Sequence, residues 1–314
     1  MATYLVTGGA GFIGSHIAHA LVLRGHEVRV LDNFSTGKRE NIAPISDSVR
    51  VVEGDIRDRS AVDGAMKGAD YVLHQAALAS VPRSIQDPCT SNAVNVDGTL
   101  NVLEAARKYH VKRVVYASSS SVYGDSEKLP KSEDMPTNPK SPYAVTKLAG
   151  EWYCGIYADI FGLPTVSLRY FNIFGPRQDP NSQYSAVIPI FVNALMRGKR
   201  ATIFGDGEHS RDFTYVENVV AANIAACESK SASGKVYNVA CGERFTLNSL
   251  YGKLKSIVGV NVDPIYEHPR PGDVKHSQAA IAAIERDLGY KPLVGFEEGL
   301  RRTIEWFREA GVTE

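Results

Sequence analysis

The sequence has few cysteines, no net charge and no long apolar run. Its four cysteines, Cys89, Cys154, Cys227 and Cys241, form no C-x-x-C pair and match no zinc spacing, so we expect four reduced, mostly buried thiols and no metal site. No run reaches the ~18 apolar residues that span a bilayer, and the N-terminus lacks the anatomy of a signal peptide. The sequence therefore predicts a cytoplasmic protein with no membrane partner.

The charges balance, because 35 Lys and Arg residues stand against 35 Asp and Glu residues. Such a chain has no basic surplus that would favour nucleic acid or an anionic membrane surface. Hydrophobic residues make up 44% of its 314 residues and charged residues 22%, which is typical of a globular protein and excludes a disordered one. The length allows one large or two modest domains.

The first half of the chain alternates short β-branched runs with longer segments of helical spacing. Strands are expected at Thr3–Thr7, Glu27–Leu31, Val49–Val52, Tyr71–His74, Val114–Ala117 and Thr165–Tyr170, and helices at Gly14–Arg24, Arg59–Met66, Asn95–Tyr109 and Tyr143–Tyr157. This alternation predicts an α/β fold, a doubly wound parallel sheet of the Rossmann type. The strands read as continuous apolar runs, as expected when helices cover both faces.

After Tyr170 the alternation gives way to segments rich in Gly, Pro, Asn and Asp, with one helix expected near Ile188–Arg197. Residues 215–238 return to a strand–helix–strand pattern. We therefore expect a Rossmann domain over residues 1–171, rejoined by residues 213–240. Residues 172–212 and 241–314 would form a smaller C-terminal α/β lobe that faces the substrate.

A glycine-rich turn follows the first strand. Gly9-x-Gly11-x-x-Gly14 matches the dinucleotide fingerprint, in which glycines let the backbone approach a pyrophosphate at a helix N-terminus. The second strand ends at Asp32, 18 residues after Gly14, where an acid binds a ribose 2′-hydroxyl and repels a 2′-phosphate. The motif therefore predicts a dinucleotide site that favours NAD over NADP.

A second motif supplies acid–base groups. In Ser141-Pro142-Tyr143-Ala144-Val145-Thr146-Lys147, serine and proline are typical of a helix start. Tyr143 and Lys147 then share one helical face, so we expect the ammonium to lower the pKa of the phenol and make it a general base. Upstream, four serines, Ser118 to Ser121, follow a strand end, where parallel sheets place ligands.

These motifs, together with Asp55-Ile56, His74-Gln75-Ala76-Ala77, the Asn95–Thr99 segment and LRYFNIFGP, make the chain resemble the extended short-chain dehydrogenase/reductase family over essentially its whole length. Within that family it most resembles the nucleotide-sugar 4-epimerases. The segments Arg177–Asn181 and Ala186–Pro189 resemble the branch that acts on UDP-N-acetylglucosamine in polysaccharide biosynthesis. The resemblance implies an isomerase that uses NAD and inverts carbon 4 of a UDP-hexose through a transient 4-keto sugar.

The resemblance also implies a role for individual residues. It implies catalytic roles for Ser119, Tyr143 and Lys147. Cofactor contacts are implied at Gly8, Gly11, Phe12, Ile13, Asp32, Asn33, Ser35, Gly37, Asp55, Ile56, Gln75, Ala76, Ala77, Asn95, Tyr143, Lys147 and Tyr170. Substrate contacts are implied at Ser80, Ser119, Ser120, Asn172, Ala186, Val187, Ile188, Ile203, Phe204, Arg211, Arg270, Asp273 and Ser277.

Three departures from related sequences narrow the chemistry. Ala79 stands where several epimerases carry a lysine, so a sugar contact there falls to Ser80 or the backbone. Ser120 and Ser121 stand where dehydratases carry Asp and Glu, which disfavours water elimination. Ser277 stands where epimerases restricted to glucose and galactose place a tyrosine. We therefore expect UDP-GlcNAc and UDP-GalNAc to be accepted, with UDP-Glc and UDP-Gal alongside.

Several alternatives remain open from the sequence. The enzyme could be restricted to UDP-Glc and UDP-Gal, or it could be a UDP-glucuronate 4-epimerase that uses Arg83 to bind the carboxylate. A binding module with an inactive dehydrogenase fold is disfavoured because Ser119, Tyr143 and Lys147 are intact. The family further implies a homodimer whose four-helix seam uses residues 95–109 and 143–157 of each subunit.

Overall fold

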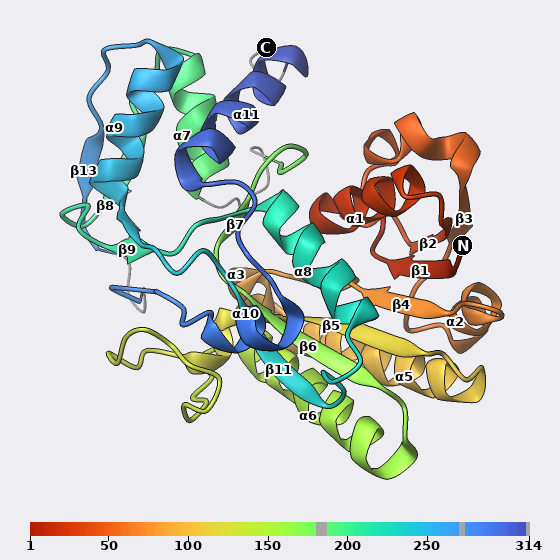
Figure 1. The fold of residues 1–314 in the computed structure, drawn as a ribbon. Helices are drawn as coiled ribbons and strands as arrows, with labels where there is room; N and C mark the ends of the chain where they lie inside the picture. Colours follow the sequence, from red (N-terminus) through yellow and green to blue (C-terminus); the bar gives the residue numbers. More distant parts are fainter. Residues whose placement is uncertain (180–186, 270–273, 312–314) are drawn as a thin grey trace.

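A seven-stranded parallel sheet organises the computed structural model of the chain, which describes residues 1–179, 187–269 and 274–311 (Figure 1). The strand order is β11-β6-β5-β4-β1-β2-β3, and every neighbouring pair is parallel. The strands are β1 (Thr3–Thr7), β2 (Glu27–Asp32), β3 (Val49–Glu53), β4 (Tyr71–His74), β5 (Arg113–Ser119), β6 (Thr165–Tyr170) and β11 (Lys235–Val239). The doubly wound α/β fold predicted from the sequence is confirmed.

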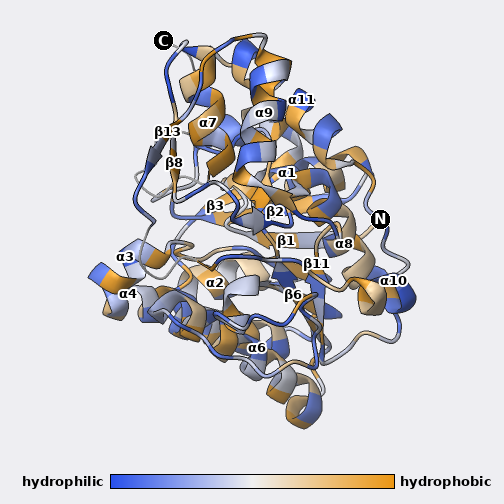
Figure 2. Ribbon diagram, turned by 90° about the vertical axis from the view of Figure 1, so that its left-hand side faces the viewer, coloured by the Kyte–Doolittle hydropathy of each residue, from blue (hydrophilic) through white to orange (hydrophobic). Residues whose placement is uncertain are grey.

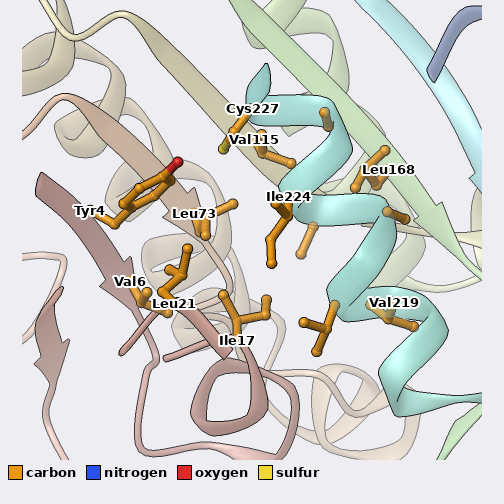
Figure 3. Packing of buried hydrophobic residues seen from close by; sticks show 14 of the residues in the cluster. Tyr4, Val6, Ile17, Leu21, Leu73, Val115, Leu168, Val219, Ile224 and Cys227 are labelled. Carbon is orange, nitrogen blue, oxygen red and sulfur yellow. The ribbon is translucent and has the colours of Figure 1, made fainter. Parts of the chain in front are cut away.

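Helices cover both faces of this sheet. One face carries α1 (Phe12–Leu23), α8 (Val216–Glu228) and α10 (Ala282–Leu288), and the other carries α2 (Arg59–Met66), α5 (Gly98–Lys108) and α6 (Pro142–Phe161). Figure 3 shows the first interface, where Ile224 of α8 and Ile17 of α1 pack against Leu73 and Val115. Because the strands are apolar on both faces, they form the centre of a three-layer structure.

Several boundaries differ from the sequence prediction, and two of them bear on the site. β5 continues to Ser119, so Ser118 and Ser119 belong to the strand rather than to the following loop. The helix expected at Asn95–Tyr109 consists of α4 (Pro88–Asn92), a π-helical turn (Ala93–Asp97) and α5. Such turns accommodate one extra residue within a helix. Within this turn the Asn95 side chain bonds the backbone of Leu78.

The C-terminal part of the chain forms a separate apolar cluster. It contains α7 (Val187–Met196), α9 (Leu247–Val258) and α11 (Phe296–Glu309), whose buried faces meet around Phe174, Phe213 and Tyr215. In Figure 2, α9 and α11 carry both hydrophobic and hydrophilic residues, as helices with one buried face do. The short elements are α3 (Val81–Gln86), β7 (Ile173–Phe174), β8 (Thr202–Phe204), β9 (Ser210–Arg211), β10 (Thr214–Tyr215), β12 (Phe245–Thr246) and β13 (Ile265–Glu267).

The segment between these parts returns to the sheet. β11 pairs with β6 from Lys235 to Val239, and α8 packs on the same sheet face as α1. The division of the chain into a Rossmann domain and a smaller lobe, with boundaries near residues 171, 213 and 240, stays a prediction. The four cysteines form no disulfide, and Cys154 and Cys227 are buried whereas Cys89 is exposed. No helix within the described residues is long and apolar enough to cross a bilayer.

Helix α6 has clear start and stop signals. Its N-cap Ser141 accepts a hydrogen bond from the Ala144 N–H at 3.2 Å, and Pro142 occupies the first turn. It ends at Gly162, whose φ of 67° is left-handed. Gly150 lies at its closest approach to the sheet, where an added Cβ would lie 2.2 Å from the Tyr116 hydroxyl oxygen. The helix can approach β5 this closely because position 150 has no side chain.

Substituting Gly150 by alanine should therefore destabilise the fold. The Cβ would displace the buried Tyr116 ring, and overpacking of this kind costs about 1–3 kcal/mol. Gly64→Ala is the matched control, because an added Cβ at this exposed position of α2 meets no atom within 4 Å. We expect that control to be neutral or slightly stabilising, by up to ~1 kcal/mol. Urea unfolding of both variants measures the difference, and equal midpoints would contradict the packing argument.

Candidate active site

A cleft of about 640 Å³ opens at the carboxyl ends of the central strands. It brings together eighteen of the residues expected to bind cofactor or substrate or to act in catalysis, from both motifs: Gly8, Gly11, Phe12, Ile13, Asp32, Asn33, Ser35, Gly37, Asp55, Ile56, Gln75, Ala76, Ala77, Ser119, Tyr143, Lys147, Tyr170 and Asn172. The cleft lies next to β1 and β4, whose connections leave the sheet in opposite directions. Doubly wound folds place ligands at this switch point.

The glycine turn fits a pyrophosphate group. Gly8 has a φ of 66°, and a Cβ on Gly14 would lie 2.2 Å from the Gly8 carbonyl oxygen, so the turn tolerates no side chain at these positions. The N-cap of α1 is Gly11, which offers no side-chain acceptor to the first N–H groups of the helix. Those groups and the helix dipole favour an anion at this end of the cleft.

Asp32 borders the cleft at the end of β2 and is held by the backbone. Its carboxylate accepts hydrogen bonds from Ala10 N at 2.9 Å and Phe34 N at 2.8 Å, and its side chain is almost buried. The nearby Lys38 ammonium lies 3.7 Å from Glu40 and 3.6 Å from Asp179, so it forms ion pairs with these two acidic side chains. This charge distribution suits a ribose with a free 2′-hydroxyl, as in NAD.

Asp55 and Asn33 form the neighbouring wall. The Asn33 amide donates to the Asp55 carboxylate at 2.8 Å, and Arg57 donates to the same carboxylate through Nε at 3.0 Å and Nη2 at 2.8 Å. The hydrogen bonds from Arg57 lower the pKa of Asp55 to about 2. The carboxylate therefore stays ionised at neutral pH and can accept hydrogen bonds from a ligand.

Tyr143, Lys147 and Ser119 meet at the inner end of the cleft. The Tyr143 N–H donates to Ser84 Oγ at 3.0 Å, which fixes the first turn of α6 to α3. Ser119 and Tyr143 both line the cleft, and Ser119 lies close enough to the Tyr143 hydroxyl to lower its pKa. The Lys147 ammonium is buried, donates to the Ala117 carbonyl at 2.8 Å and lies 5.9 Å from the centroid of the Tyr143 ring.

The pKa of Tyr143 differs in direction from the sequence prediction. Burial raises it above the ordinary phenol value, and the hydrogen bond with Ser119 lowers it in part. The expectation that Lys147 would lower the pKa of this tyrosine is wrong for the protein alone, because the ammonium points at Ala117 and burial outweighs its field. Burial also lowers the pKa of Lys147 to about 8.

A polar network supports the floor of the cleft. The Tyr170 hydroxyl lies 3.1 Å from Gln75 Oε1 and 3.1 Å from Asn223 Oδ1, and Gln75 Nε2 donates to Asn223 at 3.0 Å. Burial raises the pKa of Tyr170, so it remains a neutral phenol. Asn95 lies behind the cleft lining, where its amide bonds Leu78 and Thr146. Its predicted contact with the dinucleotide stays a prediction.

Among the described residues, the others expected to bind substrate lie outside this lining. Ser80 caps α3, Ser120 begins a 3₁₀ turn after β5, Val187 begins α7, and Phe204 ends β8. Ile188 and Ile203 are 1% exposed and belong to the C-terminal apolar cluster. Arg211 Nη1 donates to the carbonyls of Ser210 and Lys275 at 3.0 and 3.2 Å. Ser277 is partly buried, and its N–H donates to the Ser210 carbonyl at 2.9 Å.

Three residues predicted to contact substrate, Ala186, Arg270 and Asp273, lie outside the described residues. Conversely, the cleft includes residues that the sequence analysis did not assign to it, among them Thr36, Arg57, Gln178 and Asp179. Gln178 and Asp179 follow β7 and reach the cleft through the tertiary fold. Arg57 could have been predicted from the sequence Asp55-Ile56-Arg57, because an arginine two residues after an acid of the cleft can form an ion pair with it.

Comparison with known proteins assigns the family. The profile of the NAD dependent epimerase/dehydratase family matches residues 4–240. The chain belongs to this family. The match confirms the predicted resemblance, the class of enzyme and NAD as the cofactor.

Three members of the NAD dependent epimerase/dehydratase family illustrate the similarity. A UDP-glucose 4-epimerase from Mycolicibacterium smegmatis is 39% identical over 97% of this chain and 98% of its own length. The structure of a UDP-N-acetylglucosamine 4-epimerase from Methanobrevibacter ruminantium M1, in complex with UDP-N-acetylmuramic acid, is 42% identical and superposes with a TM-score of 0.94 over 98% of this chain and 99% of that one. The structure of a UDP-glucose 4-epimerase from Thermus thermophilus, in complex with NAD, is 40% identical, with a TM-score of 0.88 and the same coverage.

Proposed function

We propose that the protein is an NAD-dependent 4-epimerase of UDP-hexoses. The observation that carries this proposal is that Tyr143, Ser119 and the buried Lys147 ammonium line the same cleft as the glycine turn. Full-length similarity to 4-epimerases that act on UDP-sugars supports it. The proposed reaction oxidises carbon 4 of the sugar, turns the 4-keto sugar and reduces it from the other face.

The residues of the cleft would handle the proton. Tyr143 takes the proton of the 4-hydroxyl and later returns it, and Ser119 holds the same oxygen by a hydrogen bond. Lys147 places a positive charge near the developing phenolate, which compensates for the burial that raises the pKa of Tyr143. NAD, when bound, supplies the acceptor of the hydride from carbon 4 and its donor on return.

The substrate is proposed to keep its UDP end fixed while the sugar turns. Arg211 and Asn172 are proposed contacts of the diphosphate, and Arg270 and Asp273 are proposed to complete the nucleotide site. The Asn172 amide donates to the Asp212 carbonyl at 3.2 Å, which links the residue after β9 to the cleft wall. Serines at positions 120 and 121 supply no carboxylate for water elimination, which favours epimerisation over dehydration.

Replacing Tyr143 by phenylalanine tests the chemistry directly. Since a positioned proton-transfer group contributes roughly 10²–10⁴-fold, kcat for interconversion of UDP-GlcNAc and UDP-GalNAc should fall by that factor while NAD remains bound. Tyr71→Phe, at the amino end of β4, removes a hydroxyl far from the cleft and should keep full activity. Chromatography of the products without added NAD measures both. Near-normal turnover by Tyr143→Phe would rule out the proposed base.

The proposed acceptance of N-acetylated sugars depends on Ser277, whose small side chain leaves room for a 2-acetamido group. Ser277→Tyr should lower kcat/KM for UDP-GlcNAc by roughly 10–200-fold, the range for one pocket group, and leave UDP-Glc turnover nearly unchanged. Ser277→Ala is the control for loss of the hydroxyl alone and should spare both substrates. Unchanged N-acetyl turnover in the tyrosine variant would place the selectivity elsewhere.

A second candidate function is epimerisation of UDP-glucuronate. It is favoured by Arg83, which lines the cleft on α3 and could bind a uronate carboxylate. Including UDP-glucuronate among the substrates of the product assay separates the two functions. Turnover of UDP-glucuronate alone, lost in Arg83→Ala, would replace the hexose proposal.

We further propose that the chain forms a homodimer through α6. This helix exposes an apolar stripe of Val145, Trp152, Ile156 and Ile160, which are 53%, 63%, 44% and 71% exposed. Their spacing places them on one helical face, and such a stripe on a surface helix is typical of an interface. Leu103 of α5, within the 95–109 segment expected at the seam, is 1% exposed and belongs to the core.

The oligomeric state can be measured by sedimentation. The wild type should sediment at twice the 34.2 kDa of one chain, and Trp152→Asp should shift it to the single-chain mass because a charge would be buried in the interface. Leu293→Asp is the control, since Leu293 is 69% exposed and lies far along the chain from α6. A wild type that sediments as one chain would refute the dimer.

A further inference from the structure

Three consecutive residues at the end of β5 lie next to α6. The Ala117 carbonyl accepts from the Lys147 ammonium at 2.8 Å, the Ser118 hydroxyl donates to the Glu151 carboxylate, and Ser119 lies near the Tyr143 hydroxyl in the cleft. The three α6 partners are four residues apart in sequence and therefore follow one face of the helix. The proposed chemistry gives Lys147 and Ser119 a role, but it gives none to the contact between Ser118 and Glu151.

Ser118 faces α6 because side chains alternate between the two faces of the sheet along β5. Val114 and Tyr116 of β5 belong to the apolar cluster under α6, whereas Val115 and Ala117 belong to the cluster on the opposite face. Side chains alternate along a strand, so Ser118 continues the row that faces α6. Its register partner on β6 is Arg169, which therefore points to the same side. The apolar row thus ends in two polar side chains, and both bond Glu151.

Glu151 and Arg169 form a buried ion pair. Each is 4% exposed, and the guanidinium donates to the carboxylate through Nε at 2.9 Å and Nη2 at 2.8 Å. The Arg169 guanidinium also stacks 4.6 Å from the centroid of the Tyr123 ring. Burial alone would lower the pKa of Arg169, but the hydrogen bonds to Glu151 raise it above the ordinary value. The Arg169 guanidinium is therefore ionised at neutral pH.

The stability of the fold does not explain why Glu151 and Arg169, two charged side chains, are buried between α6 and β6. Replacing a buried ion pair by apolar side chains is often neutral or stabilising, because desolvation offsets the attraction between the charges. A buried, fixed carboxylate one helical turn beyond Lys147 has a different use. It can hold the end of the strand that carries Ser119, and it can place negative charge near an ammonium whose pKa burial lowers.

We infer that Glu151 is a positioning residue for the Ser119–Tyr143–Lys147 group, acting through Ser118 on the end of β5 and through its charge on Lys147. This inference rests on the proposed epimerase function. In this arrangement Glu151 touches neither sugar nor nicotinamide. It fixes the strand residue next to Ser119, so that the serine and tyrosine hydroxyls can share one substrate oxygen.

The charge part of the inference concerns the surroundings of Lys147. Tyr143 and Cys154 face it from α6, Tyr116 from β5, and His74 from β4. His74 is neutral, because burial lowers its pKa to about 3. Burial lowers the pKa of Lys147, whereas Glu151 acts to raise it; Cys154 is a neutral thiol, because burial raises its pKa to about 12. Glu151 is the carboxylate in this group, and it pairs with Arg169 of β6.

The positioning part is tested by two matched serine substitutions. Ser118→Ala removes the bond to Glu151 and keeps the ion pair. Ser167→Ala removes a hydroxyl of similar burial on β6, opposite Tyr116 of β5 and outside the cleft lining. Because small misplacements of reacting groups reduce rate steeply, we expect Ser118→Ala to lower kcat roughly tenfold with KM for the UDP-sugar within about twofold, and Ser167→Ala to change neither. Ser118→Thr keeps a hydroxyl and should restore most of the rate.

The charge part is tested by the pH profile of Glu151→Gln, whose amide oxygen can still accept from Ser118. Without the carboxylate the pKa of Lys147 falls further, so the alkaline limb of kcat should move to lower pH. Ser118→Ala should leave that limb in place. Thermal unfolding of each variant identifies any that do not fold, and the serine series decides the inference if Glu151→Gln is among them.

Two results separate failure of the inference from failure of the proposed function. A wild type that interconverts no UDP-sugar rejects the function. An active wild type whose Ser118→Ala variant matches Ser167→Ala, or whose Ser118→Ala loses affinity for UDP-sugar rather than rate, rejects only the inference. An alkaline limb that Glu151→Gln leaves unmoved rejects the charge part.

Discussion

The hydrogen bond from the Lys147 ammonium to the Ala117 carbonyl joins helix α6 to the end of β5, and the candidate active site is arranged around it. A buried ammonium must be compensated by acceptors, because desolvation favours its neutral form. The carbonyl of a strand end provides one such acceptor at a fixed place. Gly150, one turn further along, allows the helix to come close enough for this bond to form.

Electrostatics divide the cleft into two regions. The outer region offers the N–H groups of the α1 terminus to phosphate and the carboxylates of Asp32 and Asp55 to ribose hydroxyls. The inner region contains a neutral tyrosine, a serine and a buried lysine, backed by the Glu151–Arg169 pair. The neutral Tyr143 and Ser119 hydroxyls lie next to one cation, Lys147, and this arrangement suits proton transfer from a sugar hydroxyl.

The fold was accessible from the sequence because its signals are local. Buried parallel strands are continuous apolar runs, and β1, β4 and β6 have the predicted bounds. The glycine turn and the Tyr143–Lys147 spacing are also local, so the cleft lining around them was largely anticipated. The π-helical turn at Ala93–Asp97 was not, because it depends on side-chain contacts with the distant residues Leu78 and Thr146.

Sequence by itself determined which groups this protein carries and in what order: a glycine turn, an acid after the second strand, four serines and a tyrosine–lysine pair on one helix. Tertiary structure alone decided how those groups are charged and which of them meet. The pKa of Tyr143 follows from burial and from Ser119, which is 24 positions away in the chain, and Glu151 meets Arg169 because β6 lies beside β5. The burial of a side chain and its contacts with residues distant in the chain depend on tertiary packing, and a local sequence motif does not contain that information.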